Sequence, residues 1–381
     1  MEFSDWSNLP DELTVDILCR MPDKNLIRLK CVCKSWYFLI SNSCAPRFSS
    51  PSPSAVFCGL IYLRRSLQSG KTSLRLAPQA ASFGDVSNQL SRNLTAIEYN
   101  PEDILDCCNG LFLLASISSN PTQYYVTNPT ISECITIPVN PLHSNFESAS
   151  LAFDPTVTLH YKIIRFSRIN PSLNLDVFSS ETGDWACHTI ALEPMLDLGR
   201  WIQTSVYLNG VLYRLSVAKC MVCINLKLKE HTKTNVILKG RNIVLPQKDK
   251  FDRSGSIGTS RGALLYFNND NYRIKIWMFD DSCRWVLKHR TNFPRLVLHV
   301  TVRHIFKACG DFRLLKFYAF HPNKDEIFLG ISRVMIAYNL NANEVYFFNV
   351  VLHDEVMICD KYYVLPYSRC GVVLNSVIKS H

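Results

Sequence analysis

The sequence lacks the long apolar runs and the leader of a membrane or secreted protein. Its apolar runs, such as Leu111–Ala115, are far shorter than the roughly 20 residues that a helix needs to cross a bilayer. Met1 to Trp6 are acidic and polar, whereas a secretory signal begins with basic residues and continues with apolar ones. We therefore expect an intracellular protein, in the cytoplasm, the nucleus or both, with no membrane partner.

Motifs of metal sites and enzymes are also scarce. The 15 cysteines are an odd number and contain one Cys-x-x-Cys pair, Cys220 and Cys223, so a zinc site with four cysteines is not expected. This number and distribution of cysteines favours reduced thiols over disulfides. Neither His-Glu-x-x-His nor a nucleotide-binding Gly-x-Gly-x-x-Gly occurs. We expect no metal, no cofactor and no catalytic residues, and therefore a protein that is not an enzyme.

Positive charge is concentrated in one part of the chain. Residues 227–316 hold 19 lysines and arginines against 7 acidic residues, a net charge of +12 in a chain of net charge +9. Along Arg273–Trp277 the basic residues alternate with apolar ones, which predicts a strand with a basic face toward solvent. Nucleic-acid binding is not expected, because it needs clustered basic residues with aromatics available for stacking. The alternative is a surface that attracts an acidic or phosphorylated partner.

The N-terminal segment shows helical periodicity. Leu13, Ile17 and Met21 recur at steps of four, Pro10 suits a first helical position, and Pro22 ends the helix. A second helix is predicted after Asp23, with one apolar stripe formed by Leu26, Leu29, Cys33, Trp36 and Ile40. A module of this size has more apolar surface than it can bury alone. The excess is covered either by the rest of the chain or by another protein.

These residues together resemble an F-box, the adaptor-binding module of SCF-type ubiquitin ligases, and the plant version most closely. The match runs through Leu9-Pro10, Glu12-Leu13, Ile17-Leu18, Leu26, Arg28, Val32-Cys33-Lys34, Trp36 and Leu39-Ile40, with mild departures at Met21 and Asp23. The resemblance implies that residues 1–45 bind a Skp-type adaptor and, through it, a cullin–RING ligase. It implies these adaptor-binding residues: Leu9, Pro10, Leu13, Ile17, Leu18, Leu26, Leu29, Val32, Cys33, Trp36 and Leu39. Trp36 could equally be a core residue of the module.

The remainder of the chain predicts an all-β domain. Residues 46–54 form a Ser/Pro-rich linker, and residues 55–381 carry short β-type runs separated by turn signals such as Asn209-Gly210. Similar turn markers recur 45 to 60 residues apart, at Asn109, Asp154, Asn209, Arg261 and His321. Four short strands per interval predict the blades of a β-propeller, with six expected and five to seven allowed. Residues 55–100 and 356–377 would close the ring. A pair of β-sandwiches is the competing architecture.

One Gly/Ser-rich stretch, Ser254–Ser260, follows several basic residues. It could cradle a phosphate, but no helix pattern follows it, and the preferred interpretation is a loop between blades.

The β domain also resembles a known family. Cys108-Asn109-Gly110-Leu111, Asn128-Pro129, Asp154-Pro155 and Gly183-Asp184-Trp185 are similar to the kelch-like F-box-associated domain of plant F-box proteins. The two resemblances imply the substrate-recognition subunit of an SCF E3 ubiquitin ligase, a non-catalytic receptor that recruits a target for ubiquitination and proteasomal degradation. The target-binding residues are unknown at this stage. The alternatives are a propeller that binds a carbohydrate or small ligand without a ligase role and, third, an enzyme.

Overall fold

The computed structural model describes the two helical segments and the strands with their short turns. The described residues are 10–21, 29, 32–42, 57–66, 68–70, 72–79, 104–116, 122–139, 146–167, 173–193, 201–216, 220–231, 236–246, 255–270, 273–292, 316–331, 334–350, 355–357, 364–368, 370, 372 and 374. The predicted linker 46–54 and the residues Leu9 and Leu26 lie outside them.

The first helix, α1 (Asp11–Arg20), begins one residue later than predicted. Pro10 has an extended backbone with ψ of 144° and is the N-cap, so Asp11 is the first helical residue. The Pro10 carbonyl still accepts the first helical hydrogen bond, from Thr14 N at 3.0 Å. The helix ends at Arg20, and the C-cap residue Met21 has an extended ψ of 148° because a proline follows it.

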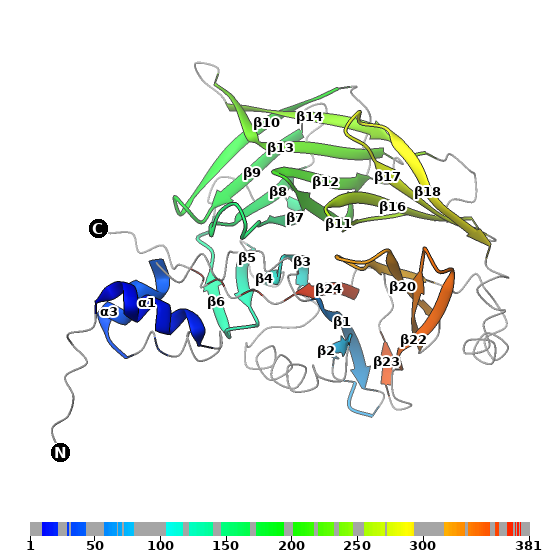
Figure 1. Cartoon of the computed structure of the whole chain (residues 1–381). Coiled ribbons are helices and arrows are strands. Elements are labelled where there is room, and N and C mark those ends of the chain that lie inside the picture. The colour runs from blue at the N-terminus through cyan, green and yellow to red at the C-terminus, as the bar shows by residue number, and fades with distance from the viewer. Residues whose placement is uncertain are drawn as a thin grey trace.

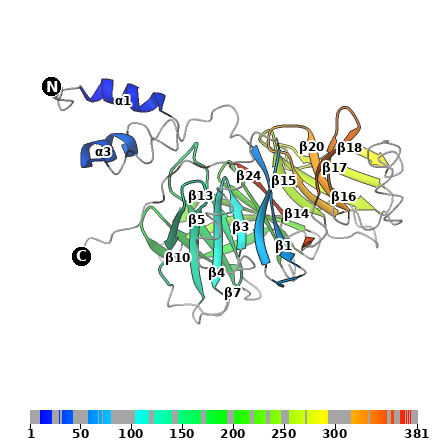
Figure 2. The same ribbon diagram turned by 90° about the horizontal axis from the view of Figure 1, so that it is seen from below.

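The second described helix, α3 (Lys34–Asn42), shows that the prediction of one helix from Asp23 through Ile40 was wrong. The chain makes a turn at Val32, and Cys33 is not helical. Cys33 instead caps α3, because its carbonyl accepts from Tyr37 N at 2.9 Å and its Sγ from Trp36 N at 3.4 Å. Both helices stand outside the ring of strands (Figures 1 and 2).

The strands form a six-bladed β-propeller, as predicted, and the sandwich alternative is wrong (Figures 1 and 2). The first strands of the blades are β24 (Val364–Ser368), β3 (Ile104–Cys108), β7 (Phe146–Ala152), β11 (Trp201–Leu208), β15 (Ser256–Ser260) and β19 (Lys316–Phe320). The second strands are β1 (Phe57–Ser66), β4 (Leu111–Ser116), β8 (Lys162–Ser167), β12 (Val211–Ser216), β16 (Ala263–Asp270) and β20 (Glu326–Ile331). The third strands are β2 (Thr72–Pro78), β5 (Gln123–Asn128), β9 (Leu173–Ser179), β13 (Cys220–His231), β17 (Arg273–Phe279) and β21 (Val334–Asn339). The described outer strands are β6 (Glu133–Thr136), β10 (Asp184–Glu193), β14 (Val236–Val244), β18 (Trp285–Asn292) and β22 (Glu344–Val350).

Blade 1 is made from both ends of the domain, and blades 2 to 6 follow in chain order. Blade 1 contains β24, β1 and β2, and the short strand β23 (Glu355–Met357) pairs with the far end of β1. Blades 2 to 6 are β3–β6, β7–β10, β11–β14, β15–β18 and β19–β22. The predicted closure of the ring by N- and C-terminal segments is thus confirmed.

The chain after β24 is fixed to blade 2. The side-chain amide of Asn128 donates to the carbonyl oxygens of Cys370 and Val372, at 3.0 and 2.7 Å. Glu133 Oε2 accepts from Leu374 N at 2.7 Å. These contacts extend the closure of the ring beyond the paired strands.

The repeated turn markers all fall between first and second strands. Asn109, Asn209 and Arg261 have positive φ values of 46°, 53° and 50°, the left-handed conformation of tight turns. Turns between third and fourth strands repeat a second signal, with positive φ at Ser132, Gly183, Cys283 and Asn343. Both sets of turns lie on the same edge of the propeller, which we call the turn rim.

The middle strands of the blades are largely buried, because each blade packs between two neighbours. The first five residues of β4 are all buried, and Phe267 of blade 5 stacks on Phe317 of blade 6 with 4.3 Å between ring centroids. This packing overturns part of the predicted basic face along Arg273–Trp277. Arg273 is exposed, but Lys275 is only 8% exposed.

Blades 3 and 4 are joined into one eight-stranded sheet. The second half of β10 pairs in parallel with β14, from Thr189 opposite Ile237 to Glu193 opposite Arg241. Outer strands of neighbouring blades normally diverge, so this pairing covers two edges that would otherwise face solvent. In the described residues the outer strands of blades 5 and 6, β18 and β22, have no such partner.

Candidate functional site

The helical module has a small core of its own. Leu18, Leu39 and Ile40 are at most 9% exposed and pack together, with Leu29 and Trp36 partly buried against them. Trp36 therefore belongs to the edge of this core, and its truncation would cost stability whether or not a partner is bound.

Large apolar side chains nevertheless remain on the surface of the module. Leu13 and Ile17, four residues apart on one face of α1, are 54% and 51% exposed, and Val32 is 60% exposed. Tyr37 and Phe38, on α3, are also exposed, and the sequence analysis did not select them. This exposure persists with the propeller present, so the described residues of the propeller do not cover these side chains.

The structure divides the eleven residues predicted to bind the adaptor into three groups. Those on the surface are Pro10, Leu13, Ile17, Val32 and Cys33; those in or against the module core are Leu18, Leu29, Trp36 and Leu39; Leu9 and Leu26 lie outside the described residues. The surface residues could contact a partner directly, whereas the core residues would hold α1 and α3 in place. Their role in adaptor binding stays a prediction.

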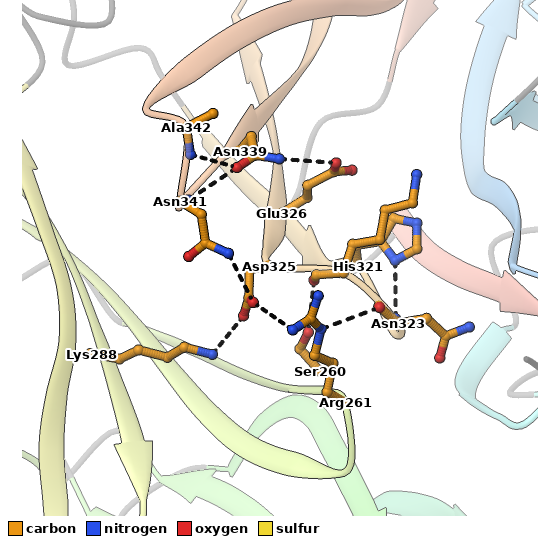
Figure 3. Close-up of polar contacts among 11 residues, drawn as sticks. Ser260, Arg261, Lys288, His321, Asn323, Asp325, Glu326, Asn339, Asn341 and Ala342 are labelled. Atoms are coloured by element: carbon orange, nitrogen blue, oxygen red, sulfur yellow. Dashed lines mark hydrogen bonds and ion pairs between the residues drawn. The ribbon is translucent and has the colours of Figure 1, made fainter. Parts of the chain in front are cut away.

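A second candidate site is a polar cluster on the turn rim between blades 5 and 6 (Figure 3). Asp325 lies at its centre and accepts from Lys288 Nζ at 2.6 Å, Arg261 Nη1 at 3.0 Å and Asn341 Nδ2 at 3.2 Å. The hydrogen bond from Lys288 is the main reason that the pKa of Asp325 is lowered. Arg261 and Lys288 come from blade 5, and Asp325 and Asn341 from blade 6, so the cluster ties the two blades together.

The turn that carries Asp325 is held from the other side by His321. His321 Nδ1 accepts from Asn323 N at 3.0 Å, so the other ring nitrogen carries the proton of the neutral imidazole. The side-chain amide of Gln79 is oriented with its oxygen toward this proton, and the oxygen accepts from His321 Nε2 at 3.0 Å and from Lys324 Nζ at 3.1 Å. Burial lowers the pKa of His321 to about 4, so the ring stays neutral. Blade 1 thus fixes this turn through Gln79.

The Gly/Ser-rich stretch proved to be a strand and not the predicted loop. Ser256–Ser260 is β15, the first strand of blade 5, and small residues are required there because a Cβ on Gly258 would lie 2.7 Å from Phe320 Cδ2. The end of β15 and the turn after it, residues 258–262, have the sequence Gly-Thr-Ser-Arg-Gly. This is a Gly-x-Ser-x-Gly pattern that the sequence analysis missed. Ser260 is 2% exposed, donates to Lys324 O at 2.8 Å and precedes a tight turn and a strand. A nucleophilic serine would need exposure and a following helix.

A buried polar network joins the first strands of blades 2, 3 and 4. Asp106 Oδ2 accepts from Leu151 N at 2.8 Å and Ser205 Oγ at 2.5 Å, and Arg214 Nη1 donates to Ser150 Oγ at 2.7 Å. Burial raises the pKa of Asp106 to about 6 and lowers that of Arg214 to about 10. These strongly perturbed groups hold strands together and are deeply buried.

One cavity of about 230 Å³ lies between blades 3 and 4. It is lined by both polar and apolar side chains, among them Lys162, Val177, Asp184, Trp185, His188 and Leu226. Its volume is below the roughly 300–1,000 Å³ that is usual for small-molecule sites. Within the described ranges, no three His, Cys, Asp or Glu side chains are grouped so that they could hold a metal ion. Nor does any helix described there have the length and apolar character to span a membrane.

Comparison with known proteins assigns both parts of the chain. Residues 6–47 match the F-box domain model, and residues 85–353 match the model described as F-box protein At3g26010-like, β-propeller. The F-box protein At3g26010 of Arabidopsis thaliana is 24% identical to this chain over 88% of the chain and 78% of its own length. At3g23970, also named as an F-box protein from Arabidopsis thaliana, is 25% identical over 97% of this chain and 93% of its own length.

The chain is thus an F-box protein with a β-propeller behind the F-box. It belongs to the family of At3g26010-like F-box propeller proteins, because that family's model covers more than half of its residues. The resemblance to plant F-box proteins drawn from the sequence is confirmed. A further Arabidopsis thaliana relative, 26% identical over 74% of the chain and 72% of its own length, is named as an F-box/kelch-repeat protein.

Proposed function

We propose that this protein is the substrate-recognition subunit of an SCF E3 ubiquitin ligase. Its F-box binds a Skp-type adaptor, which docks to a cullin–RING ligase, and its propeller holds a target protein for ubiquitination and proteasomal degradation. The observation that carries the proposal is the exposed apolar surface of Leu13, Ile17 and Val32 on a module that matches the F-box model. We place this activity in the cytoplasm or the nucleus.

The energetics support an external partner for this surface. Complete burial of a Leu, Ile or Val side chain contributes about 1.5–3 kcal/mol relative to full exposure. Leu13, Ile17 and Val32 are each about half exposed, so each leaves roughly half of that gain unused in the free chain. An adaptor that covered these three side chains, and Tyr37 and Phe38 with them, would recover this burial free energy.

In this proposal the protein brings the target close to the ubiquitin-charged enzyme and performs no bond-making chemistry itself. A receptor that holds its target beside the ubiquitin-charged enzyme raises the effective concentration of the target's lysines. The perturbed groups of the propeller fit this role, because Asp106 and Arg214 serve blade packing and His321 holds a turn.

The test is capture of ubiquitinated proteins from plant cells in which the proteasome is blocked. The tagged full chain is compared with the Leu13→Lys, Ile17→Lys variant, in which two exposed apolar residues become charged. We expect both chains to retain the same targets and only the unchanged chain to enrich their ubiquitin conjugates. Equal conjugates in both samples would contradict the ligase role.

The alternative is a propeller that binds a carbohydrate or small ligand without a ligase role. The cavity between blades 3 and 4 is the observation that favours it. Trp185→Ala would then abolish ligand binding by the full chain in a glycan and metabolite screen. Under the ligase proposal that screen gives no specific ligand.

A further inference from the structure

We propose that the turn rim at blades 5 and 6 binds a phosphorylated, acidic segment of the target protein, with Arg261 and Lys324 as the residues that contact the phosphate. This inference rests on the proposed receptor function and gives it a site and a target chemistry. It is carried by the arrangement of charges around Asp325 (Figure 3).

The charges on this part of the rim are layered. Both carboxylates lie beneath the surface, since Asp325 and Glu326 are 9% and 6% exposed. The cations lie above them: the Arg261 side chain is 58% exposed, and Lys324 is also on the surface. A ligand that approaches from solvent therefore meets positive charge first, although the three cations (Arg261, Lys288 and Lys324) and the two carboxylates together carry a net charge of only +1.

The guanidinium of Arg261 is held in place before any ligand arrives. Its Nη1 contacts Asp325 Oδ2 at 3.0 Å and its Nε donates to Asn323 O at 3.4 Å, while its backbone N donates to Pro322 O. An anchored guanidinium loses little side-chain entropy when it binds an anion, and its planar array of donors matches a phosphate.

Asp325 is ionised, but its single negative charge is shared by two cations, so the cluster keeps an excess of positive charge. Lys288 and Arg261 both contact this one carboxylate, and the hydrogen bond from Lys288 keeps its pKa low. Two cations on one carboxylate leave a charge of +1, to which Lys324 adds another. Glu326 does not cancel this charge at the surface, because it is buried and accepts from Tyr346 Oη at 2.5 Å and Asn339 Nδ2 at 3.4 Å.

A phosphorylated peptide fits these features better than a nucleic acid does. Nucleic-acid binding needs a basic track along several phosphates and aromatic faces on which bases stack. Here the two exposed cations, Arg261 and Lys324, lie in two adjoining turns, and Arg261 contacts the buried carboxylate of Asp325, so they form one small patch and no basic track. Tyr346, an exposed aromatic residue in contact with the cluster, has its hydroxyl bound to Glu326.

The experiment measures binding of peptides to the full chain, alone and with a Skp-type adaptor. The probe is a degenerate peptide library with one fixed phosphoserine, compared with the same library carrying serine or glutamate at that position. The variants are Arg261→Gln and Lys324→Gln. The control is Arg284→Gln, which removes an arginine that is 76% exposed on the neighbouring β17–β18 turn. A 12-nucleotide single-stranded RNA tests the other class of ligand.

We expect selection of the phosphoserine library and about a tenfold loss of affinity in each rim variant, with the control within about twofold. The proposal is overturned by equal binding of all three libraries, by an equal loss in the control, or by tighter, variant-sensitive binding of RNA. Lys324→Gln keeps the test valid if Arg261→Gln weakens the blade contact. If the unchanged full chain does not co-elute with the adaptor, the receptor function is refuted. Peptide binding by the chain alone still decides whether the rim site exists.

Discussion

Lys288 in β18 and Asp325 in the β19–β20 turn form an ion pair of 2.6 Å that joins blade 5 to blade 6. A β-bulge makes it possible. Ile276 of β17 pairs with His289 and Trp277 pairs with Leu287, so Lys288 between them has no opposite residue. The bulge turns Lys288 toward blade 6 together with His289, whose Nε2 lies 3.0 Å from Tyr338 Oη.

Asp325→Asn should destabilise the propeller, because it leaves Lys288 and Arg261 without their counter-charge. Losing one partner of a buried pair costs about 3–5 kcal/mol. Both cations are partly exposed here, so we expect about 1–2 kcal/mol. Urea unfolding measures the change. Arg284→Gln, which breaks an exposed pair of 3.7 Å, serves as control and should stay within about 0.5 kcal/mol.

His321 should make the propeller less stable as the pH falls. Its pKa is lowered from 6.5 to about 4 on folding, so between these values the unfolded chain binds a proton that the folded chain does not. The stability linked to this residue is complete above about pH 6.5 and declines by about 2–3 kcal/mol by pH 4. Urea unfolding from pH 7 to 4.5 should show a shallower pH dependence in His321→Asn. Parallel curves for the two chains would contradict this assignment.

Asp106 should act in the opposite direction. Its pKa is raised from 3.8 to about 6, so in this interval the folded chain holds a proton that the unfolded chain has lost. The linked stability is present at pH 4 and lost by about 2–3 kcal/mol as the pH rises through 6. Relative to the unchanged chain, Asp106→Asn should therefore be least stable at pH 4. A difference that grows toward pH 7 would show that the carboxylate is stabilised in its ionised form.

Gly258→Ala tests the packing of the first strands. The added Cβ would lie 2.7 Å from Phe320 Cδ2, so the aromatic ring of blade 6 must move. Overpacking of this kind costs about 1–3 kcal/mol. We expect a lower melting temperature in differential scanning calorimetry. Gly70→Ala, at an open turn where no atom lies within 4 Å of the new Cβ, carries only the backbone strain of its φ of +65° and is the comparison.

The sequence predicted the fold where turn chemistry repeats and failed where packing comes from a neighbouring blade. Markers such as Asn209-Gly210 located the turns, because a left-handed pair of residues leaves a recognisable dipeptide. The burial of Lys275 and the strand at Ser256–Ser260 depend on the adjacent blade, which local periodicity does not report. The break before α3 was hidden because the apolar stripe continues past Cys33.

The same contrast between local sequence and packing of separate blades applies to the two candidate sites. The F-box residues form one continuous motif, so sequence alone located that surface, although it did not separate exposed Leu13 from buried Leu18. The rim cluster joins Arg261, Lys288 and Asp325 from separate turns and strands of two blades. No spacing in the chain signals such a cluster, because its members meet only when the blades pack.

The exposed face of α1 is the proposed binding surface for a Skp-type adaptor. Isothermal titration of the adaptor into the full chain tests it, with Leu13→Lys, Ile17→Lys as the variant and Arg20→Gln, on the same helix and 77% exposed, as the control. We predict tight binding by the unchanged chain and the control, and loss of at least about a hundredfold in affinity for the variant, with unchanged circular dichroism. Equal affinity for all three chains would show that this face does not bind the adaptor.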